Sequence, residues 1–385
     1  MVAVSRWGRR NRKTGGARLL GAMAATAILA LSGCAPTPLI EQDPKAQDFG
    51  TIKISAGVSQ ETQVVAYIYA AALQQAGYHT EVVDTGGTRV GYLEKMKDPQ
   101  GPQDNSAATP TPTPEPTHAD KANPATVDLT PDYSGNLLFY LTDDGAFSTS
   151  YIEQQRSASA TPTPTATAEI TADMPTSSVT PTPEETGLNS NGMNSNDVLD
   201  SVDRLLPDEL GLLSASAAQN KDQLVVTAAT AARYNLSSLN DLAQHCKDLT
   251  FGVPQDFRDK PYGMRAIAEY YRCQPKNIIV LENHQDLSRA LAADEVQVAD
   301  ISSGSEAIDR NSYKVLDDPS GVFIAQQIVP VMRSYELPSS AQNAVNTVST
   351  QIGTDDLKTF ERLTHGTGAM KPEDVATFWL EHTKE

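Results

Sequence analysis

Hydrophobic and polar positions alternate between strand-like and helix-like patterns in the first part of the chain. Residues 51–55, Thr-Ile-Lys-Ile-Ser, and 79–83, His-Thr-Glu-Val-Val, are predicted to be short strands. Between them Val64, Val65, Ile68, Ala72 and Leu73 recur at helical spacing. Ser59 can cap this helix, and Gly77 ends it. The next expected elements are a helix at 88–97, a strand at 126–129 and a helix at 135–142.

The later half of the chain repeats this rhythm. It predicts strands at 223–227, 249–253, 278–281, 296–299, 313–316 and 328–332, and helices at 239–245, 262–271, 285–293, 339–352, 355–363 and 372–383. Strands separated by single helices predict an α/β protein whose parallel sheets carry helices on both faces. The ordered part of the chain exceeds one comfortable hydrophobic core, so we expect two lobes.

Two segments interrupt this pattern and cannot form a core. Residues 98–126 and 153–197 are rich in Pro, Thr and Ser and almost lack large apolar side chains. Such segments bury too little surface to offset chain entropy. We interpret them as flexible or polyproline-like insertions, with O-glycosylated tracts and plain solvated loops as alternatives.

The first residues indicate an exported protein. Basic residues without an acidic one precede an apolar stretch from Leu19 to Leu31, which is too short for a stable membrane span. Leu31-Ser-Gly-Cys34 is similar to a bacterial lipobox, which implies a signal peptide at 1–33, lipid on Cys34 and a tether at 34–50. We therefore expect an anchor on the outer face of the cell membrane. Arg9-Arg10 leaves twin-arginine export open beside the general route.

Charge and cysteine usage limit the partners. The formal net charge is −18, and loss of the basic leader makes it more negative. Such acidity argues against nucleic acid, because phosphate binding needs clustered Lys and Arg. Cys246 and Cys273 remain beside Cys34, and in an oxidising compartment such a pair is expected to form a disulfide. They have no nearby His pattern, so no metal site is predicted.

Motifs for enzyme chemistry are missing from the sequence. There is no Gly-x-Ser-x-Gly, His-Glu-x-x-His or phosphate loop, and the histidines share no ligand spacing. Residues 86–88, Gly-Gly-Thr, can cradle an anion at a helix N-terminus or simply form a tight turn. We predict no catalytic activity and no cofactor.

A series of weak motifs, in a consistent order, resembles the glycine betaine/choline-binding proteins of osmoprotectant ABC importers. The motifs are Gly77-Tyr, Gly86-Gly-Thr, Val127-Asp-Leu-Thr-Pro-Asp-Tyr-Ser-Gly-Asn, Leu239-Asn-Asp-Leu, Phe257-Arg-Asp-Lys-Pro-Tyr-Gly, Glu269-Tyr-Tyr, Ala290-Leu, Glu295-Val-Gln-Val-Ala-Asp, Val315-Leu-Asp-Asp and Val375-Ala-Thr-Phe-Trp-Leu. The resemblance covers about 51–96, 127–150 and 205–385.

The resemblance implies a two-lobe periplasmic-binding-protein-like fold of type II. Lobe 1 would comprise 51–224 and 328–385, and lobe 2 would comprise 225–327. Two crossing segments would join the lobes, with a small solute held in the cleft between them. The partners implied are that solute and the ABC permease subunit in the membrane, and the protein is expected to be a monomer.

The family holds a quaternary ammonium in a box of tyrosines, since ring faces are the best partners of a cation without N–H groups. The resemblance places Tyr133 on the first of these rings, with Ser134 and Asn136 beside it. The other three ring positions fall near Asp222, Ser302 and Gln326. The ligand set expected from these positions, from the family's arginine and Glu-Gln positions and from the glycine turn is Tyr133, Ser134, Asn136, Thr88, Thr62, Asp222, Lys260, Ser302 and Gln326.

Loss of three rings leaves two explanations. Neighbouring aromatics such as Tyr262, Tyr67 or Phe323 rebuild the cage, or the ligand is a different polar solute, for which Asp222 can neutralise a cation. Each residue also has a structural alternative, such as core packing for Tyr133 or backbone bonding for Gln326. The competing function is a cell-surface interaction protein that reuses the fold with a vestigial cleft.

Overall fold

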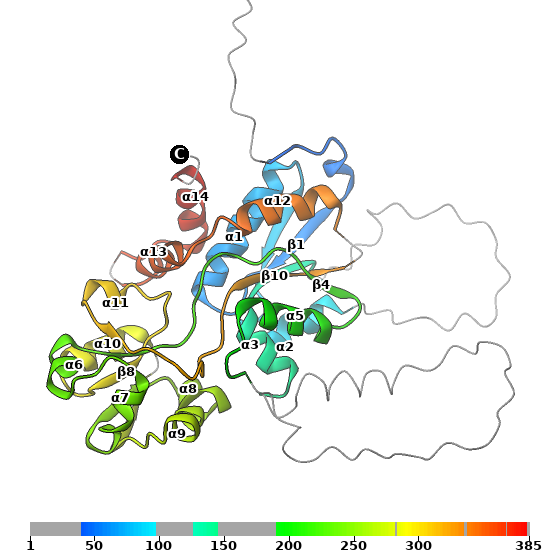
Figure 1. Cartoon of the computed structure of the whole chain (residues 1–385). Coiled ribbons are helices and arrows are strands. Elements are labelled where there is room, and N and C mark those ends of the chain that lie inside the picture. The colour runs from blue at the N-terminus through cyan, green and yellow to red at the C-terminus, as the bar shows by residue number, and fades with distance from the viewer. Residues whose placement is uncertain are drawn as a thin grey trace, which may run out of the picture. The chain divides into compact units, whose positions relative to one another are not determined.

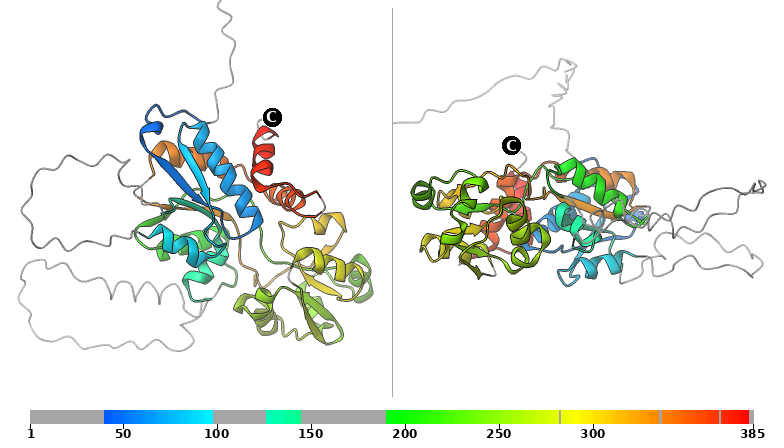
Figure 2. Two further views of the ribbon diagram at one scale, coloured as in Figure 1. Left: turned by 180° about the vertical axis from the view of Figure 1, so that it is seen from behind. Right: turned by 60° about the horizontal axis from the view of Figure 1, so that its bottom comes forward.

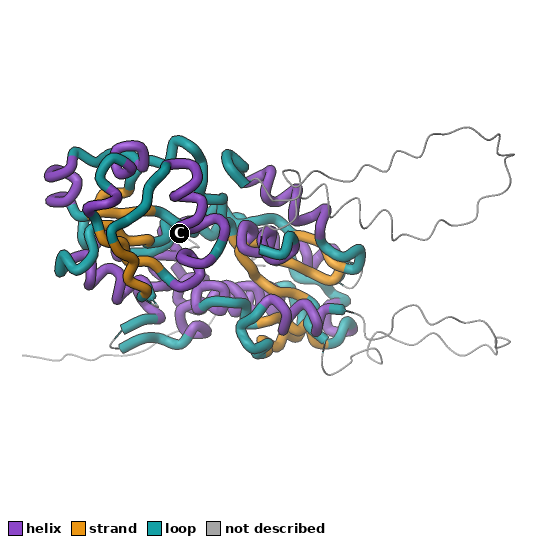
Figure 3. The backbone as a smooth tube through the Cα atoms, turned by 90° about the horizontal axis from the view of Figure 1, so that it is seen from below, coloured by secondary structure: helices purple, strands orange, loops and turns teal. Residues whose placement is uncertain are grey.

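A computed structural model describes residues 40–97, 126–144, 190–281, 283–334, 337–366 and 368–382. The leader, Cys34 and most of both insertions therefore lie outside the described residues. The described chain forms two five-stranded sheets, each with its own helices (Figure 1). The tube in Figure 3 shows helices around the strands of both sheets. The predicted α/β class is confirmed.

The first sheet has the order β2-β1-β3-β10-β4. Its strands are β1 (Thr51–Ser55), β2 (His79–Val83), β3 (Leu129–Tyr133), β4 (Leu210–Leu212) and β10 (Ile328–Arg333). β1 pairs in parallel with β2 and β3, whereas β10 is antiparallel to both β3 and β4. The sheet is mixed because β10 enters it from the other half of the chain.

Helices cover both faces of the first sheet. On one face lie α1 (Gln60–Gln75), α12 (Ser339–Ser349), α13 (Thr354–Thr364) and α14 (Pro372–His382), with α13 and α14 beside α1 (Figure 2). On the other lie α2 (Arg89–Met96), α3 (Ser134–Leu141) and α5 (Ser195–Leu205). Alternation along β10 explains this: Ile328 and Met332 join the first core, and Val331 joins the second.

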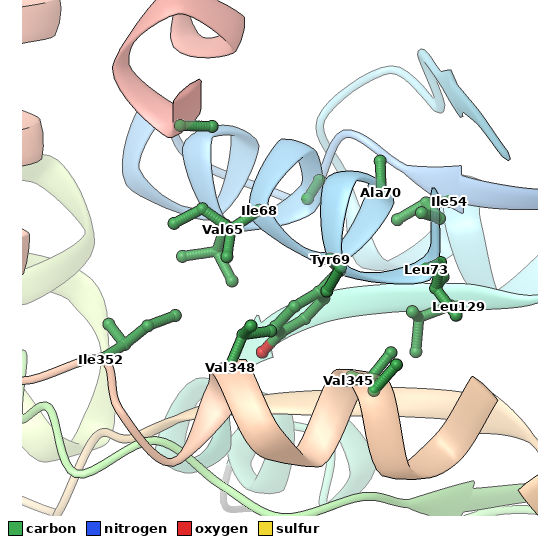
Figure 4. Close-up of a cluster of buried hydrophobic side chains, with 14 of the residues drawn as sticks. Ile54, Val65, Ile68, Tyr69, Ala70, Leu73, Leu129, Val345, Val348 and Ile352 are labelled. Carbon is green, nitrogen blue, oxygen red and sulfur yellow. The ribbon is translucent and has the colours of Figure 1, made fainter. Parts of the chain in front are cut away.

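Tyr69 shows how the first core is packed. Its ring lies fully buried between α1 and α12, near Val345 and Val348 (Figure 4). Its hydroxyl lies 3.1 Å from Ser349 Oγ, so the one polar atom of the side chain is satisfied inside the core.

The second sheet has the order β7-β6-β8-β5-β9. Its strands are β5 (Leu224–Val226), β6 (Thr250–Val253), β7 (Asn277–Val280), β8 (Val298–Asp300) and β9 (Lys314–Val315). Around them lie α6 (Ala228–Tyr234), α7 (Leu239–Ala243), α8 (Gln255–Asp259), α9 (Ala266–Tyr271), α10 (His284–Ala292) and α11 (Ala307–Arg310), and the short turns η4 (Cys246–Asp248) and η5 (Pro261–Arg265). A further short turn, η1 (Ala46–Asp48), precedes β1.

The predicted disulfide is confirmed. Cys246 and Cys273 are bonded, with their Cα atoms 5.4 Å apart. Both are buried in the core of the second sheet, where the bond ties η4 to the chain that follows α9.

Two extended segments connect the sheets. Residues 213–223 leave the first sheet after β4, and residues 316–327 return to it before β10. The two run alongside each other, since Ser216 N donates to Ile328 O and Asn220 N donates to Gln326 O, both at 2.8 Å (Figure 1).

The expectation of parallel sheets is only partly correct. β5 is antiparallel to β8 and β9, as β10 is to its neighbours, because these strands follow the crossing segments rather than a helix. β3 lies three residues later than expected. The end of the second insertion, assigned to 197, is wrong, since α5 begins at Ser195. The helices α5, α6, α8 and α11 and the strand β4 were not predicted.

No helix within the described ranges combines the length and the apolar character that a membrane crossing needs.

Candidate functional site

A cavity of about 460 Å³ opens where the first sheet faces α8 of the second. It is lined by the starts of α1 and α2, by the junction of β3 with α3, and by Asp256. Three predicted residues, Thr88, Tyr133 and Asn136, lie in this lining. Tyr140 and Ser59 line it as well.

Tyr133 is placed by the end of β3. Its backbone pairs with Ile328 of β10, and α3 begins at the next residue. The side chain is 6% exposed, and its hydroxyl has no hydrogen-bond partner among the described residues. Burial, and then the charge of Glu61, raise the pKa of this hydroxyl, while the side chains of Ser59 and Asn220 oppose the shift. The site therefore holds a buried phenol near the Ser59 and Asn220 side chains but without a partner at hydrogen-bond distance among the described residues.

A buried ion pair between Arg89 and Asp132 lies next to Tyr133 and fixes the position of Arg89 in the cavity lining. Arg89 Nε and NH2 donate to the two oxygens of Asp132 at 2.8 and 2.6 Å. The same carboxylate accepts from Tyr92 OH at 2.6 Å and from Tyr133 N at 2.7 Å. Asp132 is fully buried, so its charge requires these donors. The guanidinium of Arg89, although it lines the cavity, is already paired.

Gln326 and Ser134 join the returning crossing segment to α3. Gln326 Oε1 accepts from Asn136 N at 3.0 Å and so caps a helix whose first residues lack a side-chain cap. Ser134 Oγ accepts from Gln327 N at 3.1 Å. Gly135 allows this contact, because a Cβ there would lie 2.7 Å from Ala325 O. The polar groups of Gln326 and Ser134 thus serve the backbone.

Thr62 and Thr88 are helix caps. Thr62 Oγ1 accepts from Val58 N and Ser59 N at 2.9 and 2.8 Å, and it is fully buried. Thr88 Oγ1 accepts from Gly91 N at 3.1 Å, but Thr88 is exposed and its hydroxyl hydrogen can still donate into the cavity. Of the two, only Thr88 is available to a solute.

Two acidic residues of the second half of the fold, Asp222 and Asp300, interact with each other electrostatically. Burial, followed by opposing effects of His284 and Asp256, raises the pKa of Asp222 to about 6. Burial and then the charge of Asp222 raise the pKa of Asp300 well above its usual value, and Asp300 Oδ1 has no partner among the described residues. The two carboxyl groups act on each other, so ionisation of one makes ionisation of the other less favourable.

The remaining predicted residues, Lys260 and Ser302, lie outside the lining of this cavity. Lys260 Nζ pairs with Asp144 Oδ1 at 2.6 Å, which links the second half of the fold to the end of α3. Ser302 is 6% exposed at the end of β8 and does not line the cavity.

The aromatic residues expected to rebuild the cage behave differently from one another. Tyr262 packs on Phe139 with ring centroids 4.2 Å apart, and the pKa of its hydroxyl is raised by burial, then by Asp222 and Asp256. It is therefore close to the cavity. Phe323 is packed in the core of the second sheet, and Tyr67 packs against the core of the first.

Glu361 of α13 joins the two halves at another point. Its carboxylate accepts from Ser305 Oγ at 3.1 Å and from Glu306 N at 2.8 Å, and it lies 3.8 Å from His284 Nδ1. Burial acts to lower the pKa of His284, but Glu361, Glu61 and Asp222 together raise it above the ordinary value. His284 is therefore an imidazole that interacts electrostatically with Asp222 and Glu61, and Glu361 is its ion-pair partner.

A second cavity of about 430 Å³ lies between α10, α11 and α13. No Tyr, Phe or Trp is among the described residues that line it, and two of its three arginines, Arg289 and Arg310, pair with Asp286 and Glu306. The first cavity, with its tyrosines and unpaired polar groups, is the better candidate for a solute.

Sequence reasoning missed four groups that line the first cavity: Ser59, Arg89, Tyr140 and Asp256. It also missed Asp132, which pairs with Arg89, and His284 and Asp300, which interact electrostatically with Asp222. Asp132 lies inside the motif that identified Tyr133, so the need for a buried partner was a usable signal. Asp256 and His284 stand in helix starts, where an acidic or polar residue needs no further explanation. No group of three or more His, Cys, Asp or Glu side chains in the described ranges is arranged to hold a metal ion.

Two α/β units joined by two crossing segments, with a polar cavity where they meet, define the class of two-lobe solute-binding proteins. A family described as the substrate-binding domain of ABC-type glycine betaine transport systems matches residues 123–382, and the chain belongs to this family. Members of this family are extracytoplasmic transport proteins rather than enzymes. They bind small solutes and deliver them to a permease.

Solved structures agree on the fold. A crystal structure of a glycine betaine/carnitine/choline ABC transporter protein is 15% identical, with a TM-score of 0.59 over 87% of this chain and 100% of that chain. Apo YehZ from Escherichia coli is 17% identical, with a TM-score of 0.52 over 86% of this chain and 98% of that chain. A comparison with curated protein sequences finds no match.

Proposed function

We propose that this chain is a lipid-anchored receptor of an ABC importer. It captures a small osmolyte-like or other polar solute in the cavity at Tyr133 and passes it to the permease subunit in the membrane. The signal peptide at 1–33 exports it, and lipid on Cys34 holds it at the outer face of the cell membrane as a monomer. These assignments rest on the sequence of the leader and on membership of the family.

The observation that carries this proposal is the buried, unpartnered hydroxyl of Tyr133 in a cavity of about 460 Å³. A buried polar atom without a partner costs free energy that a bound ligand or water recovers. A volume in this range is typical of small-molecule sites. Ser59, Asn136 and Tyr140 supply further hydrogen-bonding groups in the same lining.

A thermal-shift screen of the full chain in mild detergent tests the proposal. The solutes are glycine betaine, choline, carnitine, ectoine, polyols, sugars, amino acids and amines. A ligand at one hundred times its dissociation constant adds about 2.7 kcal/mol of stability. We expect at least one solute to raise the melting temperature by several degrees, and Tyr133→Ala to remove that shift.

Failure of every solute in the screen would contradict transport and favour the competing function, a surface interaction protein with a vestigial cleft. Lipidation has its own test: Cys34→Ser should release the protein from membranes.

A further inference from the structure

The charges around the cavity do not balance. Among the described residues, no hydrogen bond or close ion pair joins the carboxylates of Glu61, Asp222 and Asp256 to another side chain, and His284, which lies against Glu361, is the cation that acts on Glu61 and Asp222 electrostatically. Asp256 lines the cavity itself. Glu61 acts electrostatically on the Tyr133 hydroxyl, and Asp222 acts on Tyr262, so these groups share one electrostatic environment.

The cations near these groups are already committed. Arg89 is held by both oxygens of the fully buried Asp132. Lys260 pairs with Asp144, and His284 lies against Glu361. A solute with a free carboxylate would therefore meet several like charges and no available cation. Bringing like charges together in a partly desolvated site is unfavourable.

The hydroxyl of Tyr133 points independently to a ligand. It is a buried polar group without a partner, on a side chain that lines the cavity and is only 6% exposed. A tyrosine side chain can accept a hydrogen bond from an N–H group through its phenol oxygen, and it can present the face of its ring to a cation. Acidic side chains alone would form only a solvated cluster, but this hydroxyl makes the place a binding site.

We propose that the solute is an organic cation that carries N–H donors and no free carboxylate, held in the cavity by Asp256 and by the hydroxyl and ring of Tyr133, with the negative charges of Glu61 and Asp222 acting from outside the lining. This proposal rests on the proposed transport function and names the class of solute for it. A quaternary ammonium has no N–H to donate, so it would use the ring face but leave the carboxylates without hydrogen bonds. A primary amine or guanidinium satisfies both, because a charge-assisted N–H···O bond is stronger than a neutral one.

Isothermal titration of the full chain with matched compounds tests this inference. Agmatine and arginine differ by one carboxylate, and putrescine and choline contrast N–H donors with a methylated nitrogen. We expect agmatine and putrescine to bind at least about tenfold more tightly than arginine and choline, the equivalent of one charge-assisted hydrogen bond. Rising salt should weaken the binding, because the attraction is electrostatic.

Charge-removing variants tie the binding to this site. Asp222→Asn and Asp256→Asn should each lower agmatine affinity about tenfold or more. Asp256 is exposed, so its replacement leaves the fold intact even if another variant does not. Asp248→Asn removes the same charge from an exposed turn that does not line the cavity, and it should bind as the wild type does.

The outcomes separate the two proposals. Tighter binding of choline, glycine betaine or a neutral solute than of either amine would overturn the cation class but keep the transport function. Amine binding that both carboxylate variants leave unchanged would also overturn it. Absence of binding by every solute would reject the transport function and this inference together.

Discussion

Asp222 shows at the scale of one residue how a binding site trades stability for function. Its carboxyl group faces Asp256, Asp300, Tyr262 and His284, and burial raises its pKa to about 6. A raised carboxyl pKa means that ionisation destabilises the folded state. At neutral pH the unliganded protein therefore carries a charge that a bound cation would stabilise.

Replacing this carboxylate should stabilise the unliganded protein. Because the pKa rises from 3.8 in the unfolded chain to about 6 in the fold, the stability of the wild type falls as pH rises through this window. We expect Asp222→Asn to unfold at a higher temperature at pH 7.5, by about 2–4 °C for each 1 kcal/mol gained. The difference should disappear below about pH 4. Thermal unfolding from pH 3.5 to 7.5 measures this, and an unchanged profile would show that Asp222 is not desolvated.

The Tyr133 hydroxyl offers a second prediction at this scale. Because it has no partner, Tyr133→Phe should leave the stability of the unliganded protein unchanged or slightly raised while weakening solute binding. Tyr92→Phe is the matched control, since the Tyr92 hydroxyl donates to Asp132 and its loss should cost about 1–3 kcal/mol. Equal losses of stability in both variants, by denaturant unfolding, would mean that Tyr133 OH has a hidden partner.

At the scale of elements, the junction between α3 and the returning crossing segment positions the site. Gly135 brings the first turn of α3 against Ala325, Ile324 and Gln326. The side-chain amide oxygen of Gln326 then caps the helix by accepting a hydrogen bond from Asn136 N. The residues on either side of Gly135, including Tyr133, therefore keep their place only if this close contact is preserved.

Gly135→Ala should disturb this junction. The added Cβ would lie 2.7 Å from a backbone oxygen, which forces the backbone to shift. We expect a loss of about 1–3 kcal/mol in unfolding free energy together with weaker solute binding. Gly353→Ala starts another helix, and its nearest contact would be 3.6 Å away, so it should cost much less. Similar losses in the two variants would contradict the close approach.

The disulfide between Cys246 and Cys273 is the second feature at the scale of elements, and it contributes to stability. Cys246 and Cys273 close a loop of 27 residues in sequence, which in the chain-entropy account adds about 3 kcal/mol. Replacing both by Ala should lower the free energy of unfolding by that order without moving the cavity residues. Denaturant unfolding of the wild type with and without a reductant checks the same quantity, and no change on reduction would reject it.

Several elements could be predicted because two independent sequence signals indicate each of them. α1 has both helical spacing and a capping box at Ser59, and Gly77 marks its end with φ of 102°. α6 and α8 were missed because each is a single short helix without a long apolar stripe. β5 is antiparallel to β8, and β10 is antiparallel to β3. These directions depend on where the chain enters each sheet, which the local sequence pattern does not encode.

The same limit applies to the site across the whole molecule. Tyr133, Asn136 and Thr88 lie near one another along a single sheet edge, and the structure places them in one cavity. Gln326, Ser134 and Thr62 were expected as ligands, and their polar groups instead serve backbone atoms. The sequence already suggested Asp222 as the partner of a cation, but its combination with Asp256 and Glu61 arises only when distant segments meet.

Contacts between the two α/β units connect binding to shape. Lys260 with Asp144, and Glu361 with Ser305 and Glu306, join residues from either side of the crossing segments. Under the proposed function, a solute bound in the cavity would add to these contacts.

Calorimetric titration of wild type and Tyr133→Ala with agmatine, choline and glycine betaine tests the central claim most directly. If the cavity at Tyr133 is the solute site, we expect one solute bound per chain, with an affinity that Tyr133→Ala lowers about tenfold or more. The absence of binding by all three solutes, or binding that Tyr133→Ala leaves unchanged, would contradict the assignment of this cavity as the solute site.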